Sequence, residues 1–390
     1  MKKIQIRNWQ SVSLLVSVGF LACVLAMTAT SCGKESKLVV ENSLPFDRVE
    51  EMVEFPVADL VSQYPEGFVI VSGEGAEVPY QLTYDGKLIF KATVGANSTA
   101  EYIVRDGKPA EVKASVFGRK FPEHKDNMNW ENEKAAYVAY GPALQAAGER
   151  GFGYDIWTKS VDTLVLEMRN KLELEGISMH KDNGNGMDAY IVSSTLGGGT
   201  AALLDSSGNI IYPWAWKEEE VLDNGPLRFT VKLTYHPAVV ENDSNVVETR
   251  VITLDSGSHL NRTEVIYSGL TTPRDVAAGI VVHTQNPEGY KLGAEQGWMS
   301  YRDSTEDTHN DNGVIYLGVV APGAKFSYLP IKEEARDALG HILAVKPYGD
   351  SGFTYWWGSG WSKGSMPDDW DAYLEECALK AESPLKVSLK

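Results

Sequence analysis

The stretch VPYQLTYDGKLIFK, residues 78–91, decides the fold class. Two runs with apolar residues at alternating positions flank Asp85-Gly86, a dipeptide that favours a tight turn between antiparallel strands. Similar short runs separated by turn residues extend from Leu38 to about Val116 and recur to the end of the chain. Their spacing predicts an all-β protein with a large antiparallel β-sandwich and few short helices.

Helical periodicity is strong in one segment only, residues 368–379. Trp370, Tyr373, Leu374 and Cys377 recur there at a spacing that makes one apolar face. Cys377 is therefore interpreted as a packed residue rather than a nucleophile. We expect an N-terminal β-strand region over residues 46–116 and a main sandwich over residues 117–390 that includes this C-terminal helix. The strand candidates of the main region include residues 163–168 and 189–193.

The first residues have the layout of a secretory signal. A basic start precedes an apolar run, and small residues then lead to Cys32. We predict a lipoprotein signal peptide over residues 1–31, lipidation at Cys32 and a polar tether over residues 32–45. The protein would then be anchored to the membrane through its acyl groups only. Cys23 is a rival cleavage point, and an uncleaved anchor is the alternative, although the apolar run is short for a span.

Charge and missing motifs exclude several classes of function. The formal net charge is −17, so nucleic acid would be repelled, and a uronate ligand would need a locally basic pocket. The sequence contains no P-loop, dinucleotide-binding glycine fingerprint, zinc-ligand cysteine cluster or serine-hydrolase motif. We therefore expect no cofactor and no catalytic metal.

Several motifs occur in an order that resembles a known family. They are NWENEKAAYVAYGPAL (129–144), GYDIWTK (153–159), HKDNGNGMDAYIV (180–192), LGGGTA (196–201) and FTYWWGSGWSKG (353–364). Together they resemble a Bacteroidetes lipoprotein family catalogued as a domain of unknown function, whose members often lie beside polysaccharide-degrading enzymes. The resemblance implies a galactose-mutarotase-like supersandwich, a carbohydrate ligand, and an outer-membrane lipoprotein on the periplasmic or cell-surface side. Glu133 departs from the aspartate usual in the family.

Four residues are the predicted catalytic set. His180 lies in a glycine-rich segment with acids, where a carboxylate could orient it as a base, and Tyr190 could act as the partner acid. Lys159 and Arg250 could depress the pKa of that tyrosine or, with Asn132, neutralise a uronate carboxylate. The alternative is that His180 only closes a turn by hydrogen bonding.

The predicted carbohydrate-binding residues are aromatic rings and polar groups from the same motifs. They are Trp130, Glu131, Asn132, Asp155, Trp157, Asp182, Trp356, Trp361 and Lys363. Strand alternation sends Trp356 and Trp357 to opposite faces, so at most one of them meets a ligand. Core packing is the alternative for each tryptophan.

Three other interpretations stay open. Glu131, Glu133 and Asp155 would suit glycoside hydrolysis if their separation were right. The segment 182–188 has the composition of a calcium loop but lacks the alternating acids of an EF-hand, so a glycine-rich turn is the default. His283 and Glu264 are weaker site candidates.

The sequence thus predicts a protein that acts on oligosaccharides. The preferred reaction is a lyase- or dehydratase-type elimination on a uronate-containing glycan. The alternative is a non-catalytic surface lipoprotein that binds glycans.

Overall fold

The computed structural model describes residues 34–304, 311–331, 335, 337–349 and 351–390. Strands hold 50% of the residues and helices about 10%, and the strands form antiparallel sheets, so the all-β prediction is confirmed. The predicted signal peptide and Cys32 lie outside the described residues. In the part that the structure describes, no helix is long and apolar enough to cross a membrane.

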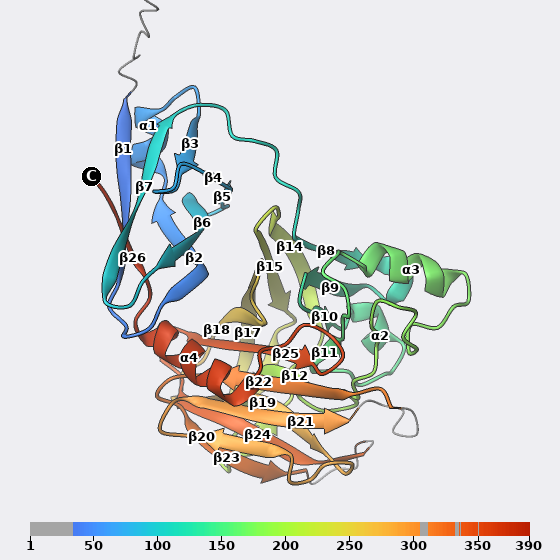
Figure 1. Cartoon of the computed structure of the whole chain (residues 1–390). Helices are drawn as coiled ribbons and strands as arrows, with labels where there is room; N and C mark the ends of the chain where they lie inside the picture. Colours follow the sequence, from blue (N-terminus) through green and yellow to red (C-terminus); the bar gives the residue numbers. More distant parts are fainter. Residues whose placement is uncertain (1–33, 305–310, 332–334, 336, 350) are drawn as a thin grey trace, which may run out of the picture. The chain divides into compact units, whose positions relative to one another are not determined.

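The predicted hairpin is present in the N-terminal half of the chain (Figure 1). A three-stranded sheet contains, in order, β2 (Arg48–Pro56), β6 (Lys87–Val94) and β5 (Tyr80–Leu82). Gly86 takes the left-handed backbone conformation with φ +74°, and its N–H donates to the carbonyl of Thr83 at 3.0 Å. The turn therefore has the chemistry that Asp85-Gly86 predicts.

A five-stranded sheet packs beside this hairpin. Its order is β26 (Lys386–Leu389), β1 (Glu35–Asn42), β7 (Ser98–Asp106), β3 (Phe68–Val71) and β4 (Glu77–Val78), and the helix α1 (Ala58–Gln63) follows β2. The tether predicted over residues 32–45 is corrected, because residues 35–42 form β1. The last strand of the chain also pairs with β1, so the predicted boundary at residue 116 does not separate the sheets completely.

Two large sheets form the sandwich. The nine-stranded sheet contains β14 (Trp216–Asn224), β15 (Arg228–Tyr235), β17 (Asp243–Asp255), β18 (Leu260–Ser268), β25 (Phe353–Trp361), β22 (Val314–Val320), β21 (Trp298–Ser304) and β20 (Tyr290–Gly293), with β16 (Ala238–Val240) paired to β17. The five-stranded sheet contains β13 (Ile210–Ile211), β12 (Gly198–Leu204), β19 (Asp275–His283), β24 (Ala338–Pro347) and β23 (Lys325–Pro330). Buried residues from alternate positions of both sheets fill one core between them.

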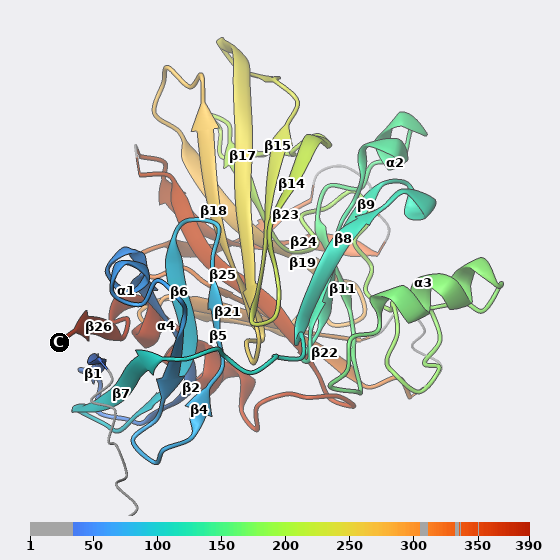
Figure 2. The same cartoon turned by 90° about the horizontal axis from the view of Figure 1, so that it is seen from above.

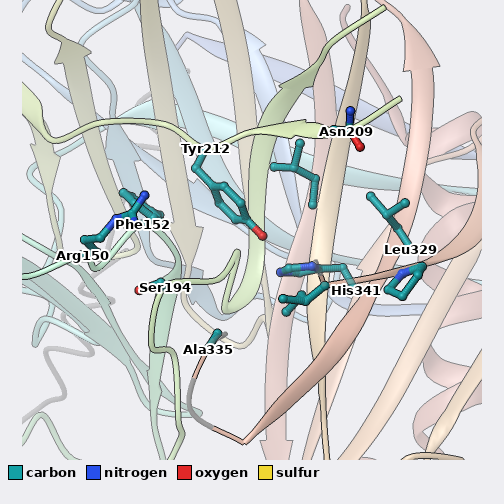
Figure 3. Close-up of a pocket in the computed structure, with 11 residues that line it drawn as sticks. Arg150, Phe152, Ser194, Asn209, Tyr212, Leu329, Ala335 and His341 are labelled. Atoms are coloured by element: carbon teal, nitrogen blue, oxygen red, sulfur yellow. The ribbon is translucent and has the colours of Figure 1, made fainter. Parts of the chain in front are cut away.

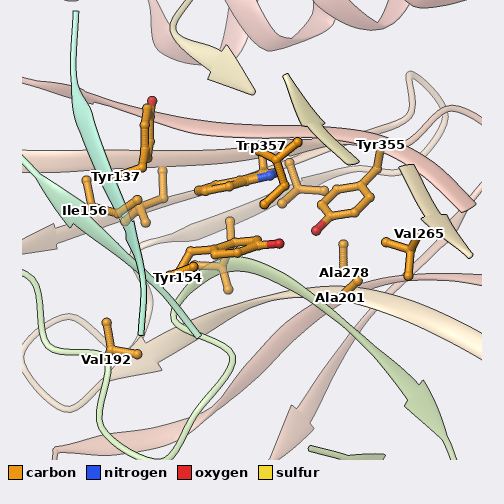
Figure 4. Close-up of a cluster of buried hydrophobic side chains, with 14 of the residues drawn as sticks. Tyr137, Tyr154, Ile156, Val192, Ala201, Val265, Ala278, Tyr355 and Trp357 are labelled. Atoms are coloured by element: carbon orange, nitrogen blue, oxygen red, sulfur yellow. The ribbon is translucent and has the colours of Figure 1, made fainter. Parts of the chain in front are cut away.

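Aromatic rings form the centre of this core (Figure 4). The Tyr154 ring stacks on Trp357 with centroids 4.1 Å apart and an interplanar angle of 7°, and Tyr137 meets the same indole edge-on at 5.2 Å. Gly199 lies against Trp357, where an added Cβ would overlap the indole. The glycine-rich motif at residues 196–201 therefore lets β12 approach the aromatic core closely.

A smaller four-stranded sheet lies next to β14 and β15 (Figure 2). It contains β11 (Tyr154–Trp157), β10 (Ala136–Ala139), β9 (Asn127–Asn132) and β8 (Val116–Phe121), with the 3-10 turn Pro122–His124 after β8. The Asn224 side chain joins the two sheets, because it accepts from the Gly118 N–H at 3.1 Å and donates to the Gly118 carbonyl at 2.9 Å.

The observed helices agree only in part with the predictions from the sequence. The C-terminal helix is confirmed as α4 (Trp370–Glu382), and α2 (Pro142–Ala146) is the short turn after β10. The strand expected over residues 163–168 is wrong, because α3 (Leu166–Leu174) begins within it. Residues 189–193 are also no strand and belong to a connection that leads to β12.

Candidate functional site

Lys159 and Glu131 form a buried ion pair in the four-stranded sheet. The Lys159 amine donates to Glu131 Oε2 at 2.7 Å, and both side chains are fully buried. Glu131 Oε1 accepts from the N–H groups of Val165 and Leu166 at 2.7 and 2.8 Å, so the carboxylate also holds the start of α3. Burial lowers the pKa of Lys159, although Glu131 opposes this. The prediction that these two residues face a ligand is corrected to a structural ion pair.

Arg250 belongs to a different cluster, between the two large sheets. Its guanidinium is fully buried, pairs with Glu248, and donates to the Tyr154 hydroxyl at 3.1 Å and to the Ala201 carbonyl at 2.9 Å. It also lies 4.5 Å from the centroid of Tyr235. Arg250 and Lys159 therefore do not line one cleft, contrary to the prediction.

Most of the predicted carbohydrate-binding rings are core residues. Trp130, Trp157 and Trp361 are 0%, 5% and 2% exposed, and Trp357 is fully buried. Trp130 Nε1 donates to Asn261 Oδ1 at 2.7 Å, which is the bond that a buried indole needs. These rings pack in the core and present no open face to a sugar in this structure. Trp356 is partly exposed, so the predicted alternation with Trp357 is confirmed.

The polar members of the predicted set close turns. Asn132 donates to the carbonyls of Asp255 and Ser258 at 2.8 and 2.7 Å. Asp182 Oδ1 accepts three backbone N–H groups, from residues 184–186, as expected for a glycine-rich turn. Lys363 donates to the carbonyl of Asp311. In the described residues, no three His, Cys, Asp or Glu side chains are placed to share a metal ion.

Asp155 lies on β11 of the four-stranded sheet and is buried. Its Oδ2 accepts from the Tyr140 hydroxyl at 3.0 Å and from Trp157 Nε1 at 3.3 Å. Burial raises the pKa of Asp155 to about 6, while these hydrogen bonds and the nearby His180 oppose the shift. His180 itself is exposed, and its Nδ1 lies 3.1 Å from the Asp188 carbonyl oxygen.

Tyr190 meets a histidine–aspartate pair inside the sandwich. His283 Nδ1 lies 2.7 Å from Asp303 Oδ2, and the Tyr190 ring contacts the His283 ring edge-on with centroids 5.8 Å apart. All three side chains are at least 95% buried. Neither the Tyr190 hydroxyl nor His283 Nε2 has a hydrogen-bond partner among the described residues. We call Asp155, Tyr190, His283 and Asp303 the acid–base cluster.

The charges of the acid–base cluster keep Tyr190 protonated. Burial raises the pKa of Tyr190 well above 10, and the negative charges of Asp303 and Asp155 raise it further. With the proton of His283 on Nδ1, toward Asp303, its Nε2 has a lone pair that can accept a proton. A phenol that can donate a proton and a ring that can accept one thus lie in contact, which is the arrangement that proton transfer needs.

A pocket of about 320 Å³ is lined by His341 of β24, and none of the acid–base cluster residues lines it (Figure 3). Tyr212 and His341 lie on one side of it with ring centroids 6.1 Å apart, and Arg150 and Phe152 lie beyond Tyr212. His341 Nε2 accepts from the Leu196 N–H at 3.1 Å. Burial, followed by the charge of nearby His283, lowers the pKa of His341 to about 3, so this ring is neutral and is close to the acid–base cluster.

Sequence reasoning missed much of this site. His283 was ranked as a weak candidate, and Asp303, His341 and Tyr140 were not singled out. The pattern Tyr301-x-Asp303 on β21 would have placed both side chains on one face of a strand. Nothing in the sequence indicates that this face meets His283 of β19.

Comparison with known proteins identifies the family. Residues 40–387 match the family described as a domain of unknown function, DUF4861. The chain belongs to this family. An uncharacterized protein P7 of Formosa agariphila is similar to this DUF4861 chain, with 25% identity over 391 residues that cover 93% of this chain and 96% of that protein.

Two solved structures also match this chain at low TM-scores. A glycosyl hydrolase family 38 protein from Enterococcus faecalis has a TM-score of 0.46 and 10% identity over 91% of this chain. An alpha-mannosidase from Enterococcus faecalis V583 has a TM-score of 0.44 and 11% identity over 91% of this chain. The DUF4861 chain spans about half the length of these two proteins, 47% and 46%.

Proposed function

We propose that this DUF4861 protein acts on uronate-containing oligosaccharides by an elimination at the acid–base cluster. One observation carries the proposal. The Tyr190 hydroxyl and His283 Nε2, both without a partner among the described residues, belong to rings in contact inside the sandwich. Buried polar atoms normally find a partner, so two such atoms on rings in contact are suited to receive a substrate.

The reaction needs two proton transfers and no oxidant. His283 Nε2 removes the proton from the carbon next to the uronate carboxylate, and the electron pair of that C–H bond forms a C=C bond. The bond from the neighbouring carbon to the leaving oxygen breaks, and Tyr190 donates its hydroxyl proton to that oxygen. Proton transfer from the His283 imidazolium to the Tyr190 phenolate then restores both groups. Asp303 stabilises the imidazolium between these steps.

We place the sugar in the pocket lined by His341, whose ring lies near His283. Arg150 also lines this pocket, and a guanidinium is the kind of group that binds a uronate carboxylate. Tyr212 and Phe152 stack with centroids 5.2 Å apart, so an apolar wall adjoins the cation. Sugar-binding sites combine such a ring wall with a few polar groups.

We also propose that the protein is a cell-envelope lipoprotein, anchored through Cys32 in the outer membrane on its periplasmic or surface side. The residue pattern around Cys32 supports this. Incorporation of a labelled fatty acid into the wild type, and its loss in Cys32→Ser, is the expected result. Equal labelling of both proteins would contradict it.

The elimination is tested with pectic, ulvan and glycosaminoglycan oligosaccharides. Elimination creates an unsaturated uronate that absorbs in the ultraviolet. We expect His283→Gln and Tyr190→Phe to lower kcat on the order of 10²- to 10⁴-fold, whereas His236→Gln, on the exposed surface, keeps wild-type turnover.

Two outcomes would overturn this assignment. If His180→Ala abolishes turnover and His283→Gln retains it, the base is the histidine of the exposed turn. If the folded protein alters no oligosaccharide but affinity gels containing these glycans retard it, the protein is a non-catalytic glycan-binding lipoprotein.

A further inference from the structure

A partly buried tryptophan, Trp356, lies on the outer face of the nine-stranded sheet, where it packs against the apolar cluster that includes Trp370 of α4. Trp356 and Trp357 are neighbours on β25, and Trp357 is fully buried in the core between the sheets. Alternation therefore directs Trp356 away from that core, and its register partner on β18 is Arg262. Trp356 thus faces away from the interior in which Tyr190 and His283 lie.

A second cavity, of about 380 Å³, adjoins Trp356. One wall is the end of β18 at Leu260, and another is α4 with Tyr373 and Lys380. The start of β2, with Glu51, closes the third side. Its volume lies in the lower part of the range for small-molecule sites. In Figure 1, α4 runs along β18, β25 and β22, which places the helix beside this wall.

Opposite charges compensate each other around this cavity. Lys380 lies 3.5 Å from Glu51 and 2.6 Å from Glu376, and Asp255 pairs with Arg228 at 2.6 Å. Both oxygens of Glu51 also accept from Arg48, and both oxygens of Asp255 accept from Arg228. Each carboxylate oxygen has a second lone pair that can accept from a ligand hydroxyl.

Three further charged groups lie on this face. Arg262 pairs with Glu264, so that guanidinium is also compensated. Glu50 adds an exposed carboxylate at the rim. An acidic ligand would therefore meet more negative than positive charge here.

We propose that this surface, defined by Trp356, Glu51, Asp255 and Lys380, binds an uncharged segment of a glycan. The apolar face of a sugar ring lies on the Trp356 indole, and hydroxyl groups donate to the carboxylates of Glu51 and Asp255. The inference rests on the proposed carbohydrate function and adds a second, non-catalytic site. This second site would bind the neutral part of a glycan while a uronate of the same glycan reacts at the acid–base cluster.

Affinity electrophoresis tests the site apart from the reaction. The full chain is run in gels that contain a soluble neutral polysaccharide, such as galactan, xylan or laminarin, with polygalacturonate as the acidic probe. We expect at least one neutral polymer to retard the wild type and His283→Gln equally. Trp356→Ala should weaken retardation about tenfold or more, the size typical of an aromatic anchor, and Trp356→Phe should keep most of it.

Three results would each overturn the inference. No neutral polymer retards the wild type, or Trp356→Ala is retarded as strongly as the wild type. In the third, only polygalacturonate retards the wild type, and Trp356→Ala reduces that retardation. Failure here is distinguishable from failure of the proposed reaction, because turnover of short uronate oligosaccharides does not involve Trp356. If circular dichroism shows that Trp356→Ala is unfolded, two other variants test the inference. Trp356→Phe should keep most of the retardation, and folded Glu51→Gln should be retarded less than the wild type.

Discussion

Replacement of Asp155 by asparagine should change how stability depends on pH. Asp155 is 4% exposed, and burial raises the pKa of its carboxyl from 3.8 to about 6. The asparagine side chain would keep the shape and could still accept from the Ile156 N–H, which donates to Asp155 Oδ1 at 2.7 Å. The amide has no proton to lose between pH 4 and 7. The substitution therefore removes one titration. It also replaces Oδ2, which accepts from Tyr140 and Trp157, by an NH2 group, a change that does not depend on pH in this range.

The sign and size follow from linkage between protonation and folding. Between pH 3.8 and about 6, the native state holds the Asp155 proton more often than the unfolded state does. Stability of the wild type therefore falls as pH rises through this window and levels off above it. A pKa difference of about 2.2 units corresponds to about 3 kcal/mol. Because part of this difference lies below pH 4, Asp155→Asn should gain about 2.4 kcal/mol in free energy of unfolding relative to the wild type between pH 4 and pH 7.

Urea unfolding at pH 4, 5, 6 and 7 measures this difference. The matched control is Asp275→Asn, which changes an exposed aspartate on β19 and should run parallel to the wild type across the range. If the Asp155→Asn and wild-type curves also run parallel, Asp155 is not a proton-holding group near neutrality. The description of the acid–base cluster would then be wrong at that residue.

Two further substitutions test the packing that supports the site. Lys159→Met leaves a buried carboxylate without its cation and should lower the free energy of unfolding by about 3–5 kcal/mol, while Lys325→Met on the exposed surface should stay within about 0.5 kcal/mol of the wild type in the same urea titration. Gly153→Ala would place a Cβ on the backbone of Gly197 and should lower the free energy of unfolding, measured by thermal unfolding, by about 1–3 kcal/mol. Its control is Gly73→Ala, where an added Cβ has no atom within 4 Å. An equal effect of both substitutions would contradict the close approach of Gly153 to Gly197.

Local signals in the sequence predicted the fold class well. The Asp85-Gly86 turn, the apolar face of α4 and the opposite directions of Trp356 and Trp357 depend on neighbours within a few residues, and all three are present. The strand expected over residues 163–168 failed for a tertiary reason. The Glu131 carboxylate, 34 residues away, binds the first N–H groups of α3 and so favours a helix there.

The candidate site was harder to predict, because charge pairing across strands is not visible in a sequence. Lys159 and Arg250 have the residue types that bind a carboxylate, but buried glutamates already neutralise them. Glu131 of β9 pairs with Lys159, and Glu248, two residues away on β17, pairs with Arg250. His283 and Asp303 are 20 residues apart and meet only through the packing of β19 against β21. Of the predicted catalytic set, Tyr190 alone lies in the acid–base cluster, and its catalytic role stays a prediction.

The most direct test of proton abstraction at the acid–base cluster is a proton NMR spectrum of a uronate oligosaccharide incubated with the protein. We predict a new vinylic signal and loss of the signal from the proton beside the carboxylate with the wild type, and an unchanged spectrum with folded His283→Gln. An unchanged oligosaccharide with the wild type, or an equally fast vinylic product with His283→Gln, would contradict the account.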